Sequence, residues 1–286
     1  MSRINVLKTY KIFIGGKFPR TESGRYFHMK NTKGDLLANM CLSSRKDFRN
    51  AVVSARKAQE SWANATTLNR GQILYRIAEM MEGRKSQFIE QLQSTGSTLS
   101  TAKKEVVISI DRLIYYAGWS DKFQQIFSTV NPVASNHFNF STLEPTGVVS
   151  IIAPNENPLL GMISLIAPTI VGGNTTVILA SATNPLVAIS LAEVINTSDV
   201  PAGVVNVLTG DREELLPQFA SHKDVNSIIY CGNKKEELKV VEEMATENLK
   251  RVSTYRRKNW KQRNSQSPYF IEKCQEIKTI WHPTEV

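Results

Sequence analysis

The sequence has little cysteine and little histidine, and neither residue type is spaced for a metal site. The 286 residues include three cysteines, Cys41, Cys231 and Cys274, and four scattered histidines. No two cysteines form a C-x-x-C pair, and no two histidines have the close spacing of a helical metal site. A disulfide-rich scaffold and a zinc finger are therefore excluded, and no metal is expected.

The sequence also has no signal for export, and its one long uncharged run is interrupted. The N-terminus is basic, but no apolar run of signal-peptide length follows it. Residues 157–192 carry no charge, which would suit a membrane helix, but Pro158, Pro168, Pro185 and the turn 172–174 divide the run. Short buried helices and strands are the favoured interpretation. We expect a cytoplasmic protein with no membrane partner.

Acidic residues are missing from one basic stretch, residues 249–263, which contains seven Lys and Arg. The net charge of +9 therefore leaves +2 (9 − 7) for the rest of the chain. Tyr255 and Trp260 lie among these cations, a combination that suits phosphate contact and base stacking. A nucleic-acid or acidic-surface binder is one interpretation, and a solvated basic tail is the other. No RNA-binding motif supports the first, so a nucleic-acid partner is not expected.

The apolar pattern of residues 147–252 predicts an α/β fold with a doubly wound parallel sheet. Short β-branched runs, apolar throughout, alternate with helical segments, as a sheet covered on both faces requires. The predicted strands are residues 147–152, 175–179, 204–208 and 226–230. The predicted helices between and after them are residues 159–171, 186–195, 213–220 and 234–247.

Upstream of the predicted sheet, the pattern indicates a small β unit and then helices. Gly15–Gly16 predicts a two-residue hairpin turn, and a further strand is expected around Lys33–Gly34. Residues 138–143 alternate in polarity and predict an extended edge segment. Helices that pack around the sheet are expected at residues 43–62, 67–81, 84–94 and 103–127.

The pattern ends near residue 255, so we divide the chain into residues 1–255 and a basic, divergent tail, residues 256–286. In residues 256–267, Trp260 is the one large apolar residue, too little to order the run, so a mobile surface segment is expected. The aromatic and aliphatic residues downstream are expected to dock onto the sheet domain. They are Tyr269, Phe270, Ile280 and Trp281.

Several motifs, taken in their order along the chain, resemble the aldehyde dehydrogenase superfamily. They are FIGGKF (13–18), NTKGDLLANM (31–40), LEPTGVVSIIAPNENPLL (143–160), GGNTTVIL (172–179) and PAGVVNVLTG (201–210). The resemblance covers about residues 10–255 and is closest to the second, cysteine-less module of aldehyde dehydrogenase family 16. It implies an aldehyde-dehydrogenase-like, Rossmann-like sheet flanked by N-terminal helices, with the catalytic domain absent.

The resemblance also implies which positions carry the chemistry, and most of them are altered. The family uses a Cys nucleophile, an Asn amide for the oxyanion and a Glu as general base. Asn155 falls on the oxyanion position counted from the preceding strand, whereas Glu156 does so counted back from Pro158. Tyr255 replaces the Glu, and its strand is expected to have left the cleft. Cys274 lies outside a Q-G-Q-C context and is interpreted as an incidental helix cysteine.

The cofactor positions implied by the resemblance are degenerate. The ribose loop K-P-x-E reads Ala180–Thr183 here and has no charge. The pyrophosphate turn G-S-T-x-x-G reads Gly232-Asn233-Lys234-Lys235-Glu236-Glu237, so Gly232 is kept and Glu237 replaces the second glycine. Gly232 and Asn233 are the candidate cofactor residues, and the two lysines either attract an anion or are solvated helix-start charges. NAD(P) is therefore expected to bind weakly at best, and no cofactor is expected.

Together these positions predict an aldehyde-dehydrogenase-family chain that is a non-catalytic pseudoenzyme or scaffold module. The first alternative is an NAD(P)-dependent aldehyde oxidoreductase whose active half lies elsewhere in a longer product. The second is a binder of nucleic acid or acidic surfaces through residues 249–263. A protein partner or a second copy is expected, because the superfamily dimerises through an edge strand of which residues 138–143 resemble a remnant.

Overall fold

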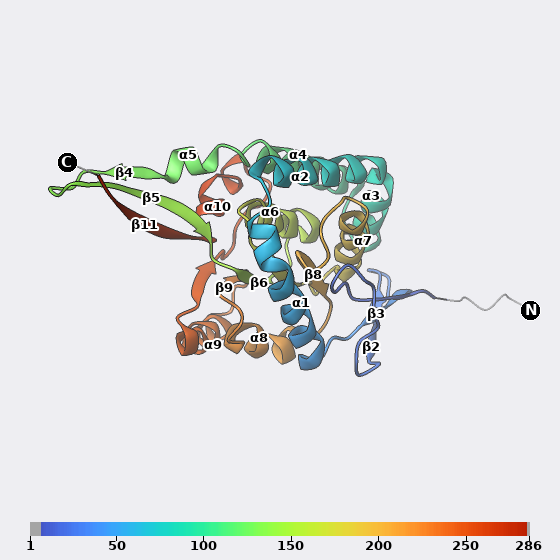
Figure 1. The fold of residues 1–286 in the computed structure, drawn as a ribbon. Helices are drawn as coiled ribbons and strands as arrows, with labels where there is room; N and C mark the ends of the chain where they lie inside the picture. The colour runs from blue at the N-terminus through green and yellow to red at the C-terminus, as the bar shows by residue number, and fades with distance from the viewer. Residues whose placement is uncertain (1–6, 285–286) are drawn as a thin grey trace, which may run out of the picture.

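A five-stranded parallel sheet lies at the centre of the computed structural model, which describes residues 7–284 (Figure 1). Its strand order is β10-β9-β6-β7-β8, and every neighbouring pair is parallel. The strands are β6 (Val148–Ile152), β7 (Thr175–Leu179), β8 (Val205–Leu208), β9 (Ser227–Tyr230) and β10 (Arg251–Thr254). The predicted doubly wound α/β sheet is confirmed, with all four expected strands adjacent.

Alternate residues of each central strand face two different helical layers. In β6, Val149 and Ile151 pack with the layer that contains α2, α4, α6 and α7, whereas Val148 and Ile152 pack with α1 and α8. All five residues of β6 are buried, which explains why four of them are Val or Ile. The fifth, Ser150, donates its hydroxyl to the Phe219 carbonyl at 3.2 Å. Within residues 7–284, no helix has the length and apolarity needed to cross a membrane.

The remaining elements follow the predicted order. The helices are α1 (Arg45–Ala63), α2 (Thr67–Gly83), α3 (Lys85–Ser94), α4 (Leu99–Ala117), α5 (Phe123–Phe127), α6 (Pro158–Val171), α7 (Pro185–Asn196), α8 (Arg212–Ser221), α9 (Lys235–Ala245) and α10 (Tyr269–Glu272). A small sheet of order β1-β3-β2 contains β1 (Thr9–Tyr10), β2 (Tyr26–Lys30) and β3 (Leu36–Cys41). A third, antiparallel sheet of order β11-β5-β4 contains β4 (Thr129–Asn131), β5 (His137–Pro145) and β11 (Gln275–Pro283). Residues 1–6, part of the segment examined above for an export signal, lie outside the described residues.

Two local predictions upstream of the sheet are wrong. Lys33 and Gly34 lie in the turn between β2 and β3 rather than in a strand, because the Asn31 Oδ1 atom accepts bonds from the amides of Lys33 (2.9 Å) and Asp35 (2.8 Å). The single helix expected over residues 103–127 is two helices, since α4 ends at Gly118. The Gly15–Gly16 turn is confirmed by reciprocal 3.0 Å amide bonds between the residues on either side.

Trp260 is 1% exposed, so the prediction that it cannot order its segment is wrong. It lies beside Gly161 of α6, where a Cβ would come within 3.3 Å of the indole nitrogen. The buried Arg112 of α4 donates to the carbonyls of Trp260 (3.0 Å) and Ser265 (2.6 Å). The prediction considered only the apolar area within the segment. The hydrogen bonds from Arg112 of α4 hold the segment in place instead.

Downstream, the tail is held by backbone pairing more than by aromatic burial. Phe270 is buried as predicted, but Tyr269 and Trp281 are 61% and 57% exposed, so their predicted docking is wrong. β11 instead pairs with β5 over nine residues. β5 is therefore extended as predicted but is not an edge strand, because β4 and β11 flank it. The division of the chain at residue 256 stays a prediction.

Replacing Arg112 with Met should release the segment around Trp260. The carbonyls of Trp260 and Ser265 would lose their donor, which should lower the free energy of unfolding by about 2–4 kcal/mol. Urea unfolding measures this loss, and limited trypsin digestion should show faster cleavage at Lys258, Lys261 and Arg263. The control is Arg76→Met, which removes an exposed guanidinium paired with Glu79. Unchanged cleavage at these three sites in Arg112→Met would contradict the anchoring role.

Candidate functional site

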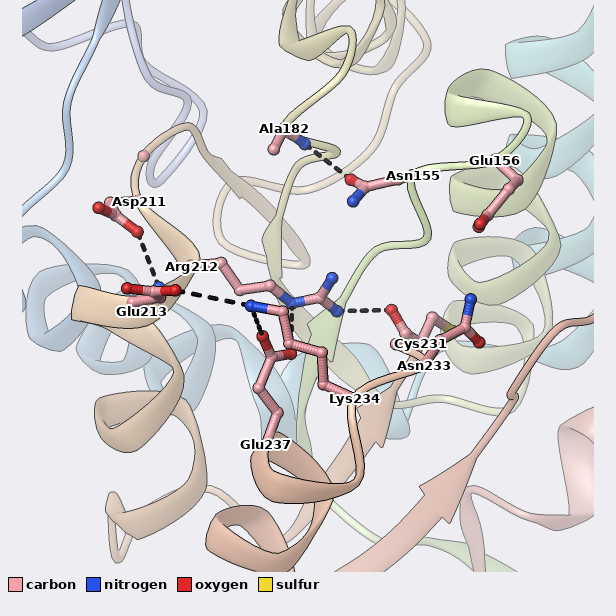
Figure 2. Close-up of a pocket in the computed structure, with 12 residues that line it drawn as sticks. Asn155, Glu156, Ala182, Asp211, Arg212, Glu213, Cys231, Asn233, Lys234 and Glu237 are labelled. Atoms are coloured by element: carbon pink, nitrogen blue, oxygen red, sulfur yellow. Dashed lines mark hydrogen bonds and ion pairs between the residues drawn. The ribbon is translucent and has the colours of Figure 1, made fainter.

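A pocket of about 620 Å³ opens at the carboxyl ends of the central strands (Figure 2). It is lined by the loops that follow β6, β7, β8 and β9 and by the first turn of α9. β6 pairs with β7 on one side and β9 on the other, so the strand order reverses there. In open α/β sheets, such a reversal leaves a crevice in which ligands bind. This pocket is therefore the candidate functional site.

The carboxylate of Glu237, in the first turn of α9, is the most heavily bonded group in the pocket. Its Oε2 atom accepts a 2.8 Å bond from the Tyr230 hydroxyl and lies 3.3 Å from the Arg212 Nε atom. Its Oε1 atom lies 3.1 Å from the Lys234 Nζ atom. Burial acts to raise the pKa of Glu237, but the hydroxyl and the two cations outweigh it and hold the pKa below its usual value.

Arg212 and Lys234 also bind other groups around the pocket. The Arg212 guanidinium donates to the Cys231 carbonyl at 2.5 Å and lies over the Tyr230 ring. The Lys234 ammonium lies 3.5 Å from Glu213, as Figure 2 shows. Both cations of the pocket are thus paired with the protein's own oxygen atoms.

The two candidate cofactor residues, Gly232 and Asn233, line this pocket. A Cβ at position 232 would overlap the Tyr230 hydroxyl, so the glycine makes room for this side chain. The Asn233 Oδ1 atom accepts a 3.0 Å bond from the amide of Arg257, whose φ is 48°. The loop after β9 is therefore held on one side by the Tyr230 side chain and on the other by the backbone amide of Arg257.

Asn155, the candidate oxyanion residue, lines the same pocket beside Glu156. Its Oδ1 atom accepts bonds from the Ala182 amide (3.1 Å) and the Ser181 hydroxyl (3.2 Å). The side chain thereby connects the loop after β6 to the loop after β7 (Figure 2). The pocket thus brings Asn155, Gly232 and Asn233 together.

Tyr255, at the candidate base position, lies outside the residues that line the pocket. Its amide donates to the Tyr230 carbonyl at 3.0 Å and continues the β10–β9 pairing, so the strand remains in the central sheet. That it has left the active-site cleft stays a prediction. The chain departs only at Arg257, where φ is positive. The Tyr255 ring stacks on Phe270 at 4.9 Å, and burial raises the pKa of its hydroxyl above the usual range.

All three cysteines are buried. Burial raises the pKa of the Cys274 thiol to about 11, and its sulfur lies 3.7 Å from the Thr169 hydroxyl. Cys274 lies in the turn between α10 and β11 rather than within a helix, so the interpretation as a helix cysteine is wrong. Burial also raises the pKa of Cys231, which lies at the pocket wall. Because the thiolate is the reactive form, neither residue is activated at neutral pH.

Sequence reasoning identified Glu237 only as a replacement for glycine and missed its partners. Lys234, three residues earlier, was visible as a helix-start charge. Tyr230 and Arg212 come from β9 and α8, and nothing in their local sequence connects them to Glu237. Among residues 7–284, no group of three metal-ligating side chains gathers anywhere.

A model of the aldehyde dehydrogenase family matches residues 19–255. The chain belongs to the aldehyde dehydrogenase family. It is 30% identical over 259 residues to cytosolic 10-formyltetrahydrofolate dehydrogenase of Mus musculus, covering 88% of this chain and 29% of that protein. It is 31% identical over 250 residues to the putative aldehyde dehydrogenase DhaS of Bacillus subtilis, covering 86% of this chain and 50% of that one.

Solved structures of the family have the same fold. The NAD⁺ complex of aldehyde dehydrogenase from Bacillus cereus superposes with a TM-score of 0.83 at 27% identity, covering 87% of this chain and 51% of that one. The HpcC protein from Thermus thermophilus superposes with a TM-score of 0.82 at 26% identity, covering 86% and 48%. This chain of the aldehyde dehydrogenase family therefore spans about half the length of these structures.

The residues of this pocket do not fit the dinucleotide that the family implies. The loop Ala180–Thr183 contains no charged side chain to hold a ribose. At the start of α9, where backbone amides of such helices bind phosphates, the carboxylate of Glu237 occupies the available cations. The fold of a nucleotide-binding domain is kept, but its contacts to phosphate and ribose are not.

Burial of the thiols leads to a direct chemical test. In the native chain, iodoacetamide at neutral pH should label Cys41, Cys231 and Cys274 at least about tenfold more slowly than in urea, because labelling needs an exposed thiolate. Intact-mass spectrometry over time measures the labelling. A single cysteine that reacts in the folded chain as fast as in urea would reveal an accessible nucleophile and contradict this description.

Proposed function

We propose that this aldehyde dehydrogenase chain is a cytoplasmic pseudoenzyme or scaffold module that does not oxidise aldehydes. The observation that carries the proposal is Tyr255, at the position implied for the general base. A general base must take a proton from water near neutral pH. A buried phenol stacked on Phe270, with its pKa raised, does not do so.

The other reactive groups support the same proposal. Neither Cys231 nor Cys274 has the exposure or the lowered pKa of a nucleophilic thiol. The Asn155 amide connects two loops through its oxygen.

Weak cofactor binding is part of the proposal. The ribose loop lacks the Lys and the Glu that the resemblance implies. Each lost charged hydrogen bond costs about 1.5–3 kcal/mol, so the two losses weaken binding by about two to four orders of magnitude.

An enzyme whose active half lies elsewhere in a longer product is the alternative. This alternative is favoured by the length of the chain, which spans about half of the B. subtilis relative. Tyr255 counts against it, because this position lies within the present chain. The resemblance to the cysteine-less module of family 16 agrees with the main proposal and remains a prediction.

The basic stretch 249–263 is a weaker candidate for function. Lys250 donates to the carbonyls of His222 and Val225, and Arg251 is paired with Glu276. Trp260 is buried and so is not available to stack on a base. These contacts support the prediction that nucleic acid is not the partner.

The three-stranded sheet β11-β5-β4 supports a second copy of the chain as the partner. It extends away from the central sheet (Figure 1), and β11 forms one of its edges. Ile277 and Trp281 of β11 are largely exposed, as are Val130 of β4 and Phe138 of β5. A long edge strand with exposed apolar side chains is a ready template for pairing with another chain.

The purified chain should not oxidise small aliphatic aldehydes with NAD⁺ or NADP⁺, followed by the absorbance of the reduced nicotinamide. Calorimetry should give a Kd for NAD⁺ in about the millimolar range or weaker. Turnover that disappears in Cys274→Ala would refute the proposal, and so would a Kd in about the micromolar range.

The edge strand predicts the oligomeric state. The wild-type chain should sediment as a dimer in analytical ultracentrifugation, and Ile277→Lys with Trp281→Lys should make it monomeric, because two charges would be buried unpaired at the new interface. Leu249→Lys is the control, since Leu249 is an exposed apolar residue outside this sheet. A wild-type chain that stays monomeric at every accessible concentration would contradict the proposed partner.

A further inference from the structure

The start of α9 faces the pocket at the place where an anion would be bound. The amides of a first helical turn carry partial positive charge and have no partners within the helix. Lys234, the residue before α9, forms no side-chain cap with these amides. The backbone at the start of this 11-residue helix therefore contributes a positive potential to the pocket.

Three side chains from three different elements converge on one carboxylate there, one as a hydrogen-bond donor and two as ion-pair partners. The Tyr230 hydroxyl comes from the end of β9, the Lys234 ammonium from the loop before α9, and the Arg212 guanidinium from the start of α8. They lie 2.8, 3.1 and 3.3 Å from the oxygen atoms of Glu237. The Glu237 side chain is only 14% exposed. Donors of these kinds are those that bind phosphate oxygens in proteins.

The charge of the pocket agrees with this arrangement. The charged residues that line it are Arg212, Lys234, Glu156, Asp211, Glu213 and Glu237. Two cations and four carboxylates give a net charge of −2, so a further anion is repelled. Without the charge of Glu237, both cations would lose their nearest common partner.

We propose that Glu237 is an internal anion that occupies the phosphate position of this pocket and closes the pocket to diphosphate groups, such as that of a dinucleotide. The inference goes beyond the proposed function, whose weak cofactor binding rests on the ribose loop and does not involve the phosphate position. The pocket is closed by a contact within the chain, and the donors for a phosphate are still present beneath it.

Glu237→Gln tests the proposal, because it removes the charge and keeps the shape of the side chain. The probe is inorganic pyrophosphate, and isothermal titration calorimetry measures its binding. Glu237→Gln should bind pyrophosphate about ten- to hundredfold more tightly than the wild-type chain, the range that freed charged hydrogen bonds supply. Adding Arg212→Gln to this variant should remove the gain.

Glu236→Gln is the matched control. It removes the same charge from the same turn of α9, but Glu236 is exposed and does not line the pocket. Its affinity for pyrophosphate should stay close to that of the wild-type chain. If Glu236→Gln gains as much as Glu237→Gln, net charge rather than occupancy explains the effect, and the proposal is wrong. It is also wrong if folded Glu237→Gln binds no more tightly than the wild-type chain.

Two further measurements keep the test decisive. If circular dichroism shows that Glu237→Gln does not fold, Glu237→Ala takes its place. If neither variant folds, the test is an NMR titration of the wild-type chain with pyrophosphate. The chemical shift of the Glu237 carboxyl should not change when pyrophosphate is added. A change in this shift would overturn the proposal. Aldehyde oxidation assayed in parallel reports on Tyr255 and the thiols, so failure of the proposed function is seen separately.

Discussion

Parallel pairing of β6 with both β7 and β9 positions the other strands of the central sheet and the pocket at their carboxyl ends. Because β6 is flanked on both sides by strands that enter the sheet after it, the chain must cross over in opposite directions, and a crevice is left at the carboxyl ends. The pairing is made by the backbone and is covered on both faces by buried, mostly apolar side chains. The pocket therefore persists even where the residues around it no longer suit a nucleotide.

Gly232 keeps the residue type of the family motif but has a different structural role here. Gly232 matches a family glycine, but here it gives space to the Tyr230 hydroxyl, which in turn donates to Glu237. Glu237 stands where the motif has a second glycine. The two positions therefore act together. The absence of a side chain at Gly232 makes room for the Tyr230 hydroxyl, and this hydroxyl donates to the carboxylate of Glu237.

Elements determined by local apolar pattern could be predicted from the sequence. The strands β6 to β9 are mostly apolar because helices cover both faces of the sheet, and α6 and α7 are apolar because they are buried, so this pattern is visible along the chain. The turn at Lys33–Gly34 was missed because it depends on one side chain, that of Asn31, which binds two backbone amides.

Contacts between distant segments could not be predicted. Arg112 bonds to a carbonyl 148 residues away, so no local count of apolar area identifies Trp260 as an anchored residue. Glu105 of α4 likewise accepts bonds from the amides of Leu159 and Leu160 at the start of α6, more than 50 residues away. In the candidate site, Glu237 was visible as a departure from a motif, but its partners Tyr230 and Arg212 were not. Side chains that form hydrogen bonds or ion pairs between different elements are brought together by the fold, and they produce no periodic pattern in the sequence.

The ionisation of Glu237 tests the central claim most directly, because a carboxylate held by a hydroxyl and two cations resists protonation. The measurement is an NMR pH titration of the Glu237 carboxyl in the wild-type chain. We expect a pKa below the usual value of about 4.3 for glutamate, since Tyr230, Lys234 and Arg212 favour the charged form. A Glu237 carboxyl that titrates at or above this value would show that the three side chains do not hold it, and would contradict the account.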